Sequence, residues 1–232
     1  MRPLLLSAVL CVAGFACTPN VISSGDPDSG QMDPDAGNNP SDAGTDPNPY
    51  PGGPYGISVN RIIQNFTLPG YLATGAGVKA NTLPLLNDLD LQKIRKATDS
   101  AGHPLRYLLL DISAGWCPPC NQEAQDLGLN GTKSTQIAAW AAKGGVFMTA
   151  LVEGYDESTG AAPVEGDVET WINQHNVQSS VVYDPTQKLI AQGISPSAFP
   201  TNLVIDLQTM KIVSAWYGLD TTYQKWEAAL GP

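Results

Sequence analysis

The second half of the chain alternates between apolar runs and amphipathic stretches. Unbroken apolar runs predict strands that are buried on both faces of a sheet, because a half-exposed strand would alternate apolar and polar residues. These runs occupy residues 107–112, 146–152 and 181–183. Helical spacing of apolar residues, with caps and Gly or Pro at the ends, predicts helices. They occupy residues 117–129, 132–143, 167–175, 185–192 and 221–230.

Two further strands, 203–206 and 211–217, are joined by a tight turn and precede the last predicted helix. Strands that alternate with helices, followed by two adjacent strands, predict an α/β sandwich with a mixed sheet. The region ahead of it, residues 57–106, gives weaker signals. Phe66–Gly70 predicts an extended segment at a sheet edge, and residues 89–97 predict a short helix.

The first 16 residues predict an export signal. A short basic start at Met1-Arg2 precedes an apolar run from Leu4 to Phe15, and the small residue Ala16 follows. The run is shorter than the ~20 apolar residues that a membrane-spanning helix needs. An uncleaved membrane anchor is the alternative interpretation. The sequence therefore predicts a protein that acts outside the cytoplasm.

Cys17 directly follows the predicted signal. Gly14-Phe15-Ala16-Cys17 resembles a bacterial lipoprotein processing site, in which the cysteine is lipidated and becomes the new N-terminus. The same residues also suit ordinary signal cleavage after Ala16, which would leave Cys17 as the first mature residue without a lipid. We expect the lipidated form, a membrane-anchored lipoprotein on the periplasmic side.

Residues 17–56 predict a disordered tether behind this anchor. The stretch 18–56 holds eight Pro, seven Gly and six Asp, and neither Lys nor Arg. A segment with so little apolar surface to bury does not offset the entropy cost of ordering its backbone. The remaining residues, 57–232, are long enough for one domain with a substantial core.

Charge and cysteine content narrow the function of this domain. Sixteen acidic and eleven basic residues remain in it, so its net charge is about −5 and nucleic acid is not expected as a partner. Only two cysteines lie beyond residue 17, too few for a disulfide framework. We expect a monomer whose core holds the fold without disulfide cross-links.

The two remaining cysteines form the motif Cys117-Pro118-Pro119-Cys120, at the junction of a predicted strand and a predicted helix. Unpaired N–H groups at the helix start stabilise a thiolate at Cys117, which favours attack on disulfides. Cys120 follows three residues later on the same helical face, where it can resolve a mixed disulfide. The motif predicts a dithiol that cycles to a disulfide and needs no other cofactor.

A structural disulfide and half of a zinc site are the alternative interpretations of this motif. A disulfide between residues three apart closes a very small loop, so it stabilises the fold little. A zinc site needs two more ligands, and beyond carboxylates the domain offers only His103 and His175. These residues lie in a predicted loop and a separate predicted helix. We therefore expect no metal.

Trp116 and the motif that follows it, placed after an apolar strand, resemble the thioredoxin superfamily. The wider pattern over residues 57–232 is similar to its exported branch, the TlpA/ResA-like disulfide reductases. The segments that carry this similarity are Phe66-Thr67-Leu68, Val182-Tyr183-Asp184, Ala198–Asp206 and Gly218. The resemblance implies a thioredoxin-like three-layer sandwich with a central mixed sheet. It also implies a cis Pro200 facing the dithiol, with Phe199 exposing its backbone to substrate.

The resemblance assigns roles to three neighbours of the dithiol. Asp111 matches a buried acid that helps to deprotonate the resolving thiol in thioredoxins. Glu123 matches a glutamate of the TlpA/ResA-like motif, and Trp116 is expected to pack beside the dithiol in the substrate site. The alternatives are a strand-end Asp111 in solvent, a solvated helix carboxylate at Glu123, and a plain core aromatic at Trp116.

The activity implied is thiol–disulfide exchange, in the direction that reduces disulfides of exported proteins. Apocytochromes in cytochrome c maturation are one such class, and an upstream thiol reductant would regenerate the dithiol. A copper-handling thioredoxin-fold module and a thiol peroxidase are the alternative functions. The first usually adds a His or Met near the cysteine pair, and the second usually has a lone cysteine in a Thr-containing context. Trp116-Cys117 does not match that context.

Overall fold

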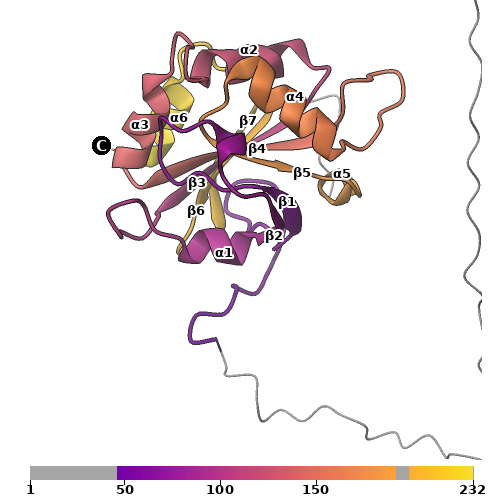
Figure 1. Cartoon of the computed structure of the whole chain (residues 1–232). Coiled ribbons are helices and arrows are strands. Elements are labelled where there is room, and N and C mark those ends of the chain that lie inside the picture. Colours follow the sequence, from indigo (N-terminus) through magenta and orange to yellow (C-terminus); the bar gives the residue numbers. More distant parts are fainter. Residues whose placement is uncertain (1–45, 192–198, 232) are drawn as a thin grey trace, which may run out of the picture. The chain divides into compact units, whose positions relative to one another are not determined.

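The computed structural model describes residues 46–191 and 199–231 (Figure 1). The predicted export signal at residues 1–16, the lipidation site Cys17 and the tether as far as residue 45 lie outside the described residues. These three assignments stay predictions. Across the described residues, no helix is both long enough and apolar enough to span a bilayer.

Seven strands form one sheet in the order β2-β1-β5-β4-β3-β6-β7. Their bounds are β1 Thr67–Tyr71, β2 Leu86–Asp90, β3 Tyr107–Ala114, β4 Gly145–Glu153, β5 Ser180–Tyr183, β6 Thr201–Asp206 and β7 Lys211–Tyr217. Strands β3, β4 and β5 run parallel, and the other four pair antiparallel with their neighbours. The predicted mixed sheet is confirmed. Its three parallel strands are the runs that the sequence marks as buried on both faces.

Helices cover both faces of this sheet, which gives the predicted three-layer sandwich (Figure 1). The helical elements are η1 Ala80–Thr82, α1 Leu91–Lys96, α2 Pro118–Leu127, α3 Thr135–Ala142, α4 Glu165–His175, α5 Lys188–Ala191 and α6 Gln224–Leu230. Helices α2, α3, α4 and α6 pack on one face, through Trp140, Trp171 and Trp226 among others. Helix α1 packs on the other face through Leu91 and Ile94.

Three local predictions differ from the structure. The segment around Phe66–Gly70 becomes strand β1, which lies between β2 and β5 and is not at the edge. The predicted helix at 89–97 is shorter in the structure, because residues 89 and 90 are the last two residues of β2 and the helix starts at Leu91. Helix α4 begins at Glu165, so Asp167 lies in its first turn and accepts from the Val164 N–H at 2.9 Å. These boundaries depend on contacts with neighbouring strands and turns. A local sequence pattern holds no information about those contacts.

The compact domain begins at Pro47, ten residues ahead of the boundary predicted from composition. The guanidinium of Arg95 donates to the carbonyl oxygens of Asn48 and Pro49, at 3.2 and 3.0 Å. The hydroxyl of Tyr50 donates to the carbonyl oxygen of Ile63 at 2.8 Å. A Pro- and Gly-rich segment cannot build a core of its own, but it can bind to the surface of one.

Candidate active site

The dithiol lies where β3 turns into α2. Cys117 is the N-cap residue of the helix, and its Sγ accepts a hydrogen bond from the Cys120 N–H at 3.3 Å. The two cysteines form a disulfide with their Cα atoms 5.3 Å apart. Pro118 and Pro119 fill the first two helical positions and carry no N–H. The N–H of Cys120 is therefore the first main-chain N–H of the helix that can donate a hydrogen bond to Cys117.

Both cysteines are covered. Cys117 exposes 2% of its surface and Cys120 none, so both are buried in the disulfide form. Trp116 and Phe199, both partly buried, pack against the apolar cluster that contains the two cysteines. Trp116 lies in a turn, and Phe199 lies just ahead of β6, far from Cys117 in sequence. The burial of Cys117 therefore involves tertiary packing.

Glu153, at the end of β4, holds Trp116 in place. The Trp116 Nε1–H donates to the Glu153 carboxylate at 2.7 Å. The Trp116 and Phe199 rings meet edge to face with their centroids 5.9 Å apart. The sequence pattern places Glu153 at the start of a polar loop, yet it is 5% exposed and belongs to the strand. Trp116 therefore lies beside the dithiol, as predicted, and a carboxylate that the sequence did not single out orients it.

The bond between Phe199 and Pro200 is cis, which confirms the isomer expected at this position. Phe199 packs against the cluster that contains Cys117, so the start of β6 lies at the dithiol. Pro200 is also joined to the end of β7, since its carbonyl oxygen accepts from the Gly218 N–H at 2.8 Å. This part of the chain is far from the dithiol in sequence, and the sheet brings the two together.

Asp111 is a buried acid on β3 and is not a solvated strand-end residue. It is 1% exposed, and its carboxylate accepts from the Ser113 hydroxyl at 2.8 and 2.9 Å and from the Thr149 hydroxyl at 3.3 Å. Burial raises the pKa of Asp111 to about 7, and the hydrogen bonds from the two hydroxyls oppose that shift. An acid with this pKa can exchange protons near neutral pH.

Glu123 is the second buried acid of the site. It lies on α2, three residues after Cys120, and is 1% exposed. Its Oε1 accepts from the Trp226 Nε1–H at 3.2 Å, and its Oε2 has no hydrogen-bond partner among the described residues. Burial, and next the nearby charge of Asp111, raise the pKa of Glu123 well above its ordinary value. Glu123 is therefore not a solvated helix carboxylate, and its burial favours the uncharged form.

No protein-family model matches this sequence, and no curated protein matches it. The structure is similar to thiol:disulfide interchange protein DsbE from Chlorobium tepidum, with a TM-score of 0.50 and 22% sequence identity over 75% of this chain and 99% of that one. It is also similar to the thioredoxin domain of a thiol-disulfide oxidoreductase from Bacteroides vulgatus. That match has a TM-score of 0.50 and 16% identity, and covers 75% of this chain and 99% of the other. The chain has the thioredoxin fold.

One pair of residues in this thioredoxin fold was not singled out from the sequence as part of the site. His175 ends α4, and its Nε2 lies 2.9 Å from Oδ1 of Asn121 on α2. The Asn121 amide donates to the carbonyl oxygens of Gly115 and Cys117, at 2.9 and 2.7 Å. Since that amide nitrogen is the donor, Oδ1 accepts and His175 carries its proton on Nε2. The sequence offered His175 only as one of two histidines that could complete a zinc site.

We predict that protonation of His175 destabilises the domain in mild acid. Burial lowers the pKa of His175 below its ordinary value of 6.5. The unfolded chain therefore takes up a proton first, so this contribution to stability is present above about pH 6.5 and is lost as pH falls through the folded-state pKa. His175→Gln should flatten the fall in unfolding free energy between about pH 7 and pH 5. Urea unfolding at each pH measures it, and an unchanged slope would contradict the assignment.

The thioredoxin fold here shows no clustered metal ligands. Within residues 46–191 and 199–231, no group of three or more His, Cys, Asp and Glu side chains is arranged to hold a metal ion. His103 is a surface residue that pairs with Asp99 at 3.1 Å, and His175 is bonded to Asn121. Both histidines that the sequence suggested as possible zinc ligands thus interact with other side chains.

Proposed function

We propose that this protein is a thiol–disulfide oxidoreductase that reduces disulfides of exported proteins through Cys117 and Cys120. The observation that carries the proposal is the disulfide at the start of α2, together with two buried carboxylic acids: Asp111 on β3, the strand that leads to it, and Glu123 on α2. A structural disulfide would need no buried acid on these two elements, and a carboxyl group in a core is costly to keep. Acids with raised pKa values are typical of sites that move protons.

The reaction begins with the reduced protein. The Cys117 thiolate attacks one sulfur of a substrate disulfide, so that the substrate disulfide breaks, a mixed disulfide forms, and the released substrate thiolate takes up a proton. Asp111 then accepts the Cys120 proton, and the Cys120 thiolate attacks the Cys117 sulfur. The mixed disulfide breaks, the Cys117–Cys120 disulfide forms, and the second substrate thiol leaves. Two electrons have passed to the substrate.

The neighbouring groups have distinct roles in this scheme. The Cys120 N–H donates to the Cys117 sulfur and stabilises its thiolate. The raised pKa of Glu123 favours its uncharged form, which limits the negative charge near Asp111 while Asp111 takes the proton. Phe199 packs against the cluster that contains the dithiol, and we propose that its backbone pairs with an extended stretch of substrate. An upstream thiol reductant would return the disulfide to the dithiol.

The cellular setting follows from the N-terminal sequence. We propose that the protein is exported, lipidated at Cys17 and held at the periplasmic side of a membrane by the tether that follows. Its partners would be exported proteins that carry disulfides, apocytochromes among them, and its own disulfide would be its only redox group. The Cys17→Ser variant should then fractionate as soluble protein, and a wild-type protein that is already soluble would refute the anchor.

The reduction potential of the Cys117–Cys120 couple tests the direction of the proposed reaction. Pro118 and Pro119 remove two N–H donors that would otherwise stabilise the reduced, thiolate form, so the couple should be reducing. We expect a potential nearer to that of thioredoxin, about −270 mV, than to that of the oxidant DsbA, about −120 mV. Equilibration with glutathione or dithiothreitol redox buffers, with free thiols counted, measures it. A potential near the oxidant's value would overturn the reductase direction.

A further inference from the structure

Strand β7 forms one edge of the sheet, and within the described residues only its first part is covered by another segment. The N-terminal segment Asn60–Ile63 lies along it: the Asn60 N–H donates to the Ile212 carbonyl oxygen at 2.8 Å, and the Ile212 N–H donates to that of Arg61 at 2.9 Å. A bulge follows, opposite Val204 and Ile205. Beyond the bulge the covering segment makes no further backbone bond to β7.

The backbone of the remaining part of β7 presents free hydrogen-bonding groups. The Gly218 N–H points to Pro200 at the start of β6, and backbone groups alternate between the two sides of a strand. Trp216 and Ser214 therefore face β6, whereas Ala215 and Tyr217 face away from it. Among the described residues, none bonds to the outward N–H and C=O groups of Ala215 and Tyr217. Such a row of groups is a template for another strand.

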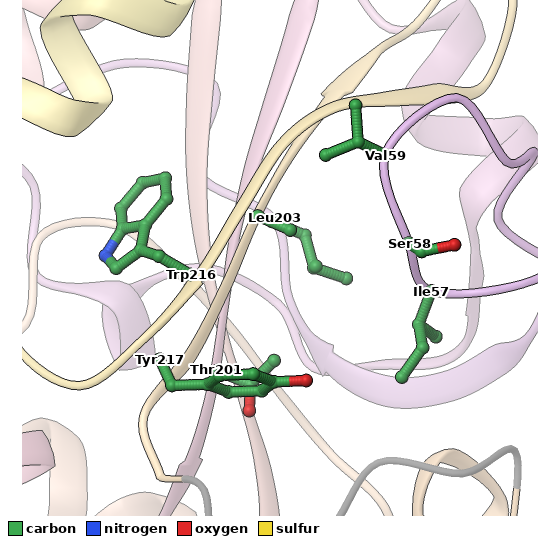
Figure 2. A pocket seen from close by; sticks show the side chains of 8 residues that line it. Ile57, Ser58, Val59, Thr201, Leu203, Trp216 and Tyr217 are labelled. Atoms are coloured by element: carbon green, nitrogen blue, oxygen red, sulfur yellow. The ribbon is translucent and has the colours of Figure 1, made fainter.

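A hollow flanks this edge on each face of the sheet. One, of about 250 Å³, lies between Val59 on the N-terminal segment and Tyr217 on β7, with Leu203 in its wall (Figure 2). The other, of about 460 Å³, lies between β7 and α6 and is lined by Ser214, Trp216 and Lys225 among others. Side chains of an added strand alternate between the two faces of a sheet, so both hollows would receive them.

The free edge carries none of the usual protection against strand addition. Soluble proteins blunt their edges with charges, particularly Lys, and with Pro. Residues 212–217 contain no charged residue and no proline. Val59, Val213 and Tyr217 expose 45%, 42% and 66% of their surface, and they account for half of the large apolar residues that are exposed in the described chain. An apolar, unprotected edge of this kind is typical of a binding surface.

The free part of β7 is also the part that leads to the dithiol. Tyr217 pairs with Thr201, the residue after Pro200, and Gly218 bonds to Pro200 itself. Phe199 then meets Trp116 next to Cys117. The segment Asn60–Ile63 covers the part of β7 that is farther from the dithiol. A chain that pairs with the uncovered part therefore lies at the end of β7 next to the proposed substrate site.

We propose that the free edge of β7, residues Val213–Tyr217, binds an extended, uncharged stretch of the substrate protein as an added strand. The inference rests on the proposed function, because the bound stretch belongs to the protein whose disulfide is reduced. Backbone bonds to Ala215 and Tyr217 supply binding without sequence preference, and the two hollows favour apolar side chains. The dithiol thereby gains a second contact with protein substrates that a small disulfide cannot make.

Single-turnover oxidation of the reduced full-length protein tests this proposal. The rate constants with insulin, a protein disulfide, and with oxidised glutathione, a small disulfide, are compared by stopped flow. Ala215→Pro removes an outward N–H, and Tyr217→Asp places a charge at the mouth of a hollow. Each should lower the insulin rate constant about tenfold and change the glutathione rate constant less than about twofold, because only a strand-forming substrate uses the edge.

Val78→Asp is the matched control for Tyr217→Asp, since it places the same charge at an exposed apolar residue (49%) outside β7. It should leave both rate constants unchanged, and circular dichroism checks that Ala215→Pro folds. Equal insulin rates in the edge variants and the control would overturn the docking edge. A wild-type dimer that Ala215→Pro dissociates would overturn it too, because the edge would then join two copies. If the wild-type dithiol reacts with neither disulfide, the proposed function itself fails.

Discussion

Replacing Cys117 by serine is expected to reduce disulfide exchange to the uncatalysed background, whereas Cys120→Ser is expected to trap a covalent mixed disulfide with the substrate. Cys117 is the N-cap of α2, where it receives the Cys120 N–H, so its thiolate is the better stabilised of the two. Cys120 lies inside the helix with no exposed surface. We therefore expect Cys117 to attack first and Cys120 to release the product.

The measurement is non-reducing gel electrophoresis and mass spectrometry after mixing each variant with insulin. Both variants are made in a Cys17→Ser background, so that no third thiol competes. The double variant Cys117→Ser with Cys120→Ser serves as the control and should form no adduct. Trapping by Cys117→Ser in place of Cys120→Ser would reverse the two assignments.

Asp111→Asn is expected to make the domain more stable and the resolving step slower. The folded-state pKa of Asp111 is raised to about 7, from its ordinary value of 3.8. The folded protein therefore keeps a proton that the unfolded chain has lost, and wild-type stability falls as pH rises from about 4 through 7. The amide carries no charge, so the variant should escape this loss and gain roughly 2–4 kcal/mol of unfolding free energy at pH 8. At pH 4 the difference should vanish.

In the proposed mechanism, the same substitution removes the proton acceptor for Cys120. We expect release of the mixed disulfide to slow about ten- to hundredfold at pH 7, and its rise with pH around neutrality to disappear. Denaturant unfolding from pH 4 to pH 8 and stopped-flow kinetics from pH 6 to pH 9 give the two readouts. Glu123→Gln is the matched control on the second acid, and it should stabilise the domain without removing the Asp111 inflection. If the Asp111→Asn variant is more stable but releases the mixed disulfide at an unchanged rate, Asp111 has only a structural role.

The sequence by itself was informative wherever a local pattern has one physical cause. The run at 107–112 is buried on both sides in the structure because it forms strand β3, between β4 and β6. The motif Cys117-Pro118-Pro119-Cys120 has the composition of a helix start, and α2 begins at Pro118. The resemblance to known reductases supplied Pro200 and its cis bond, and no periodicity in the chain would have done so.

Relations between distant segments were decided only by the tertiary structure. Glu153 binds Trp116 across 37 residues, and His175 binds Asn121 across 54. Strand β1 lies between β2 and β5, and the free part of β7 is set by where Asn60–Ile63 ends. The burial of Glu123 also depends on Trp226 of α6, which covers it. Local propensity and periodicity report on neighbours along the chain, whereas burial, hydrogen-bond partners and open edges depend on which elements pack together.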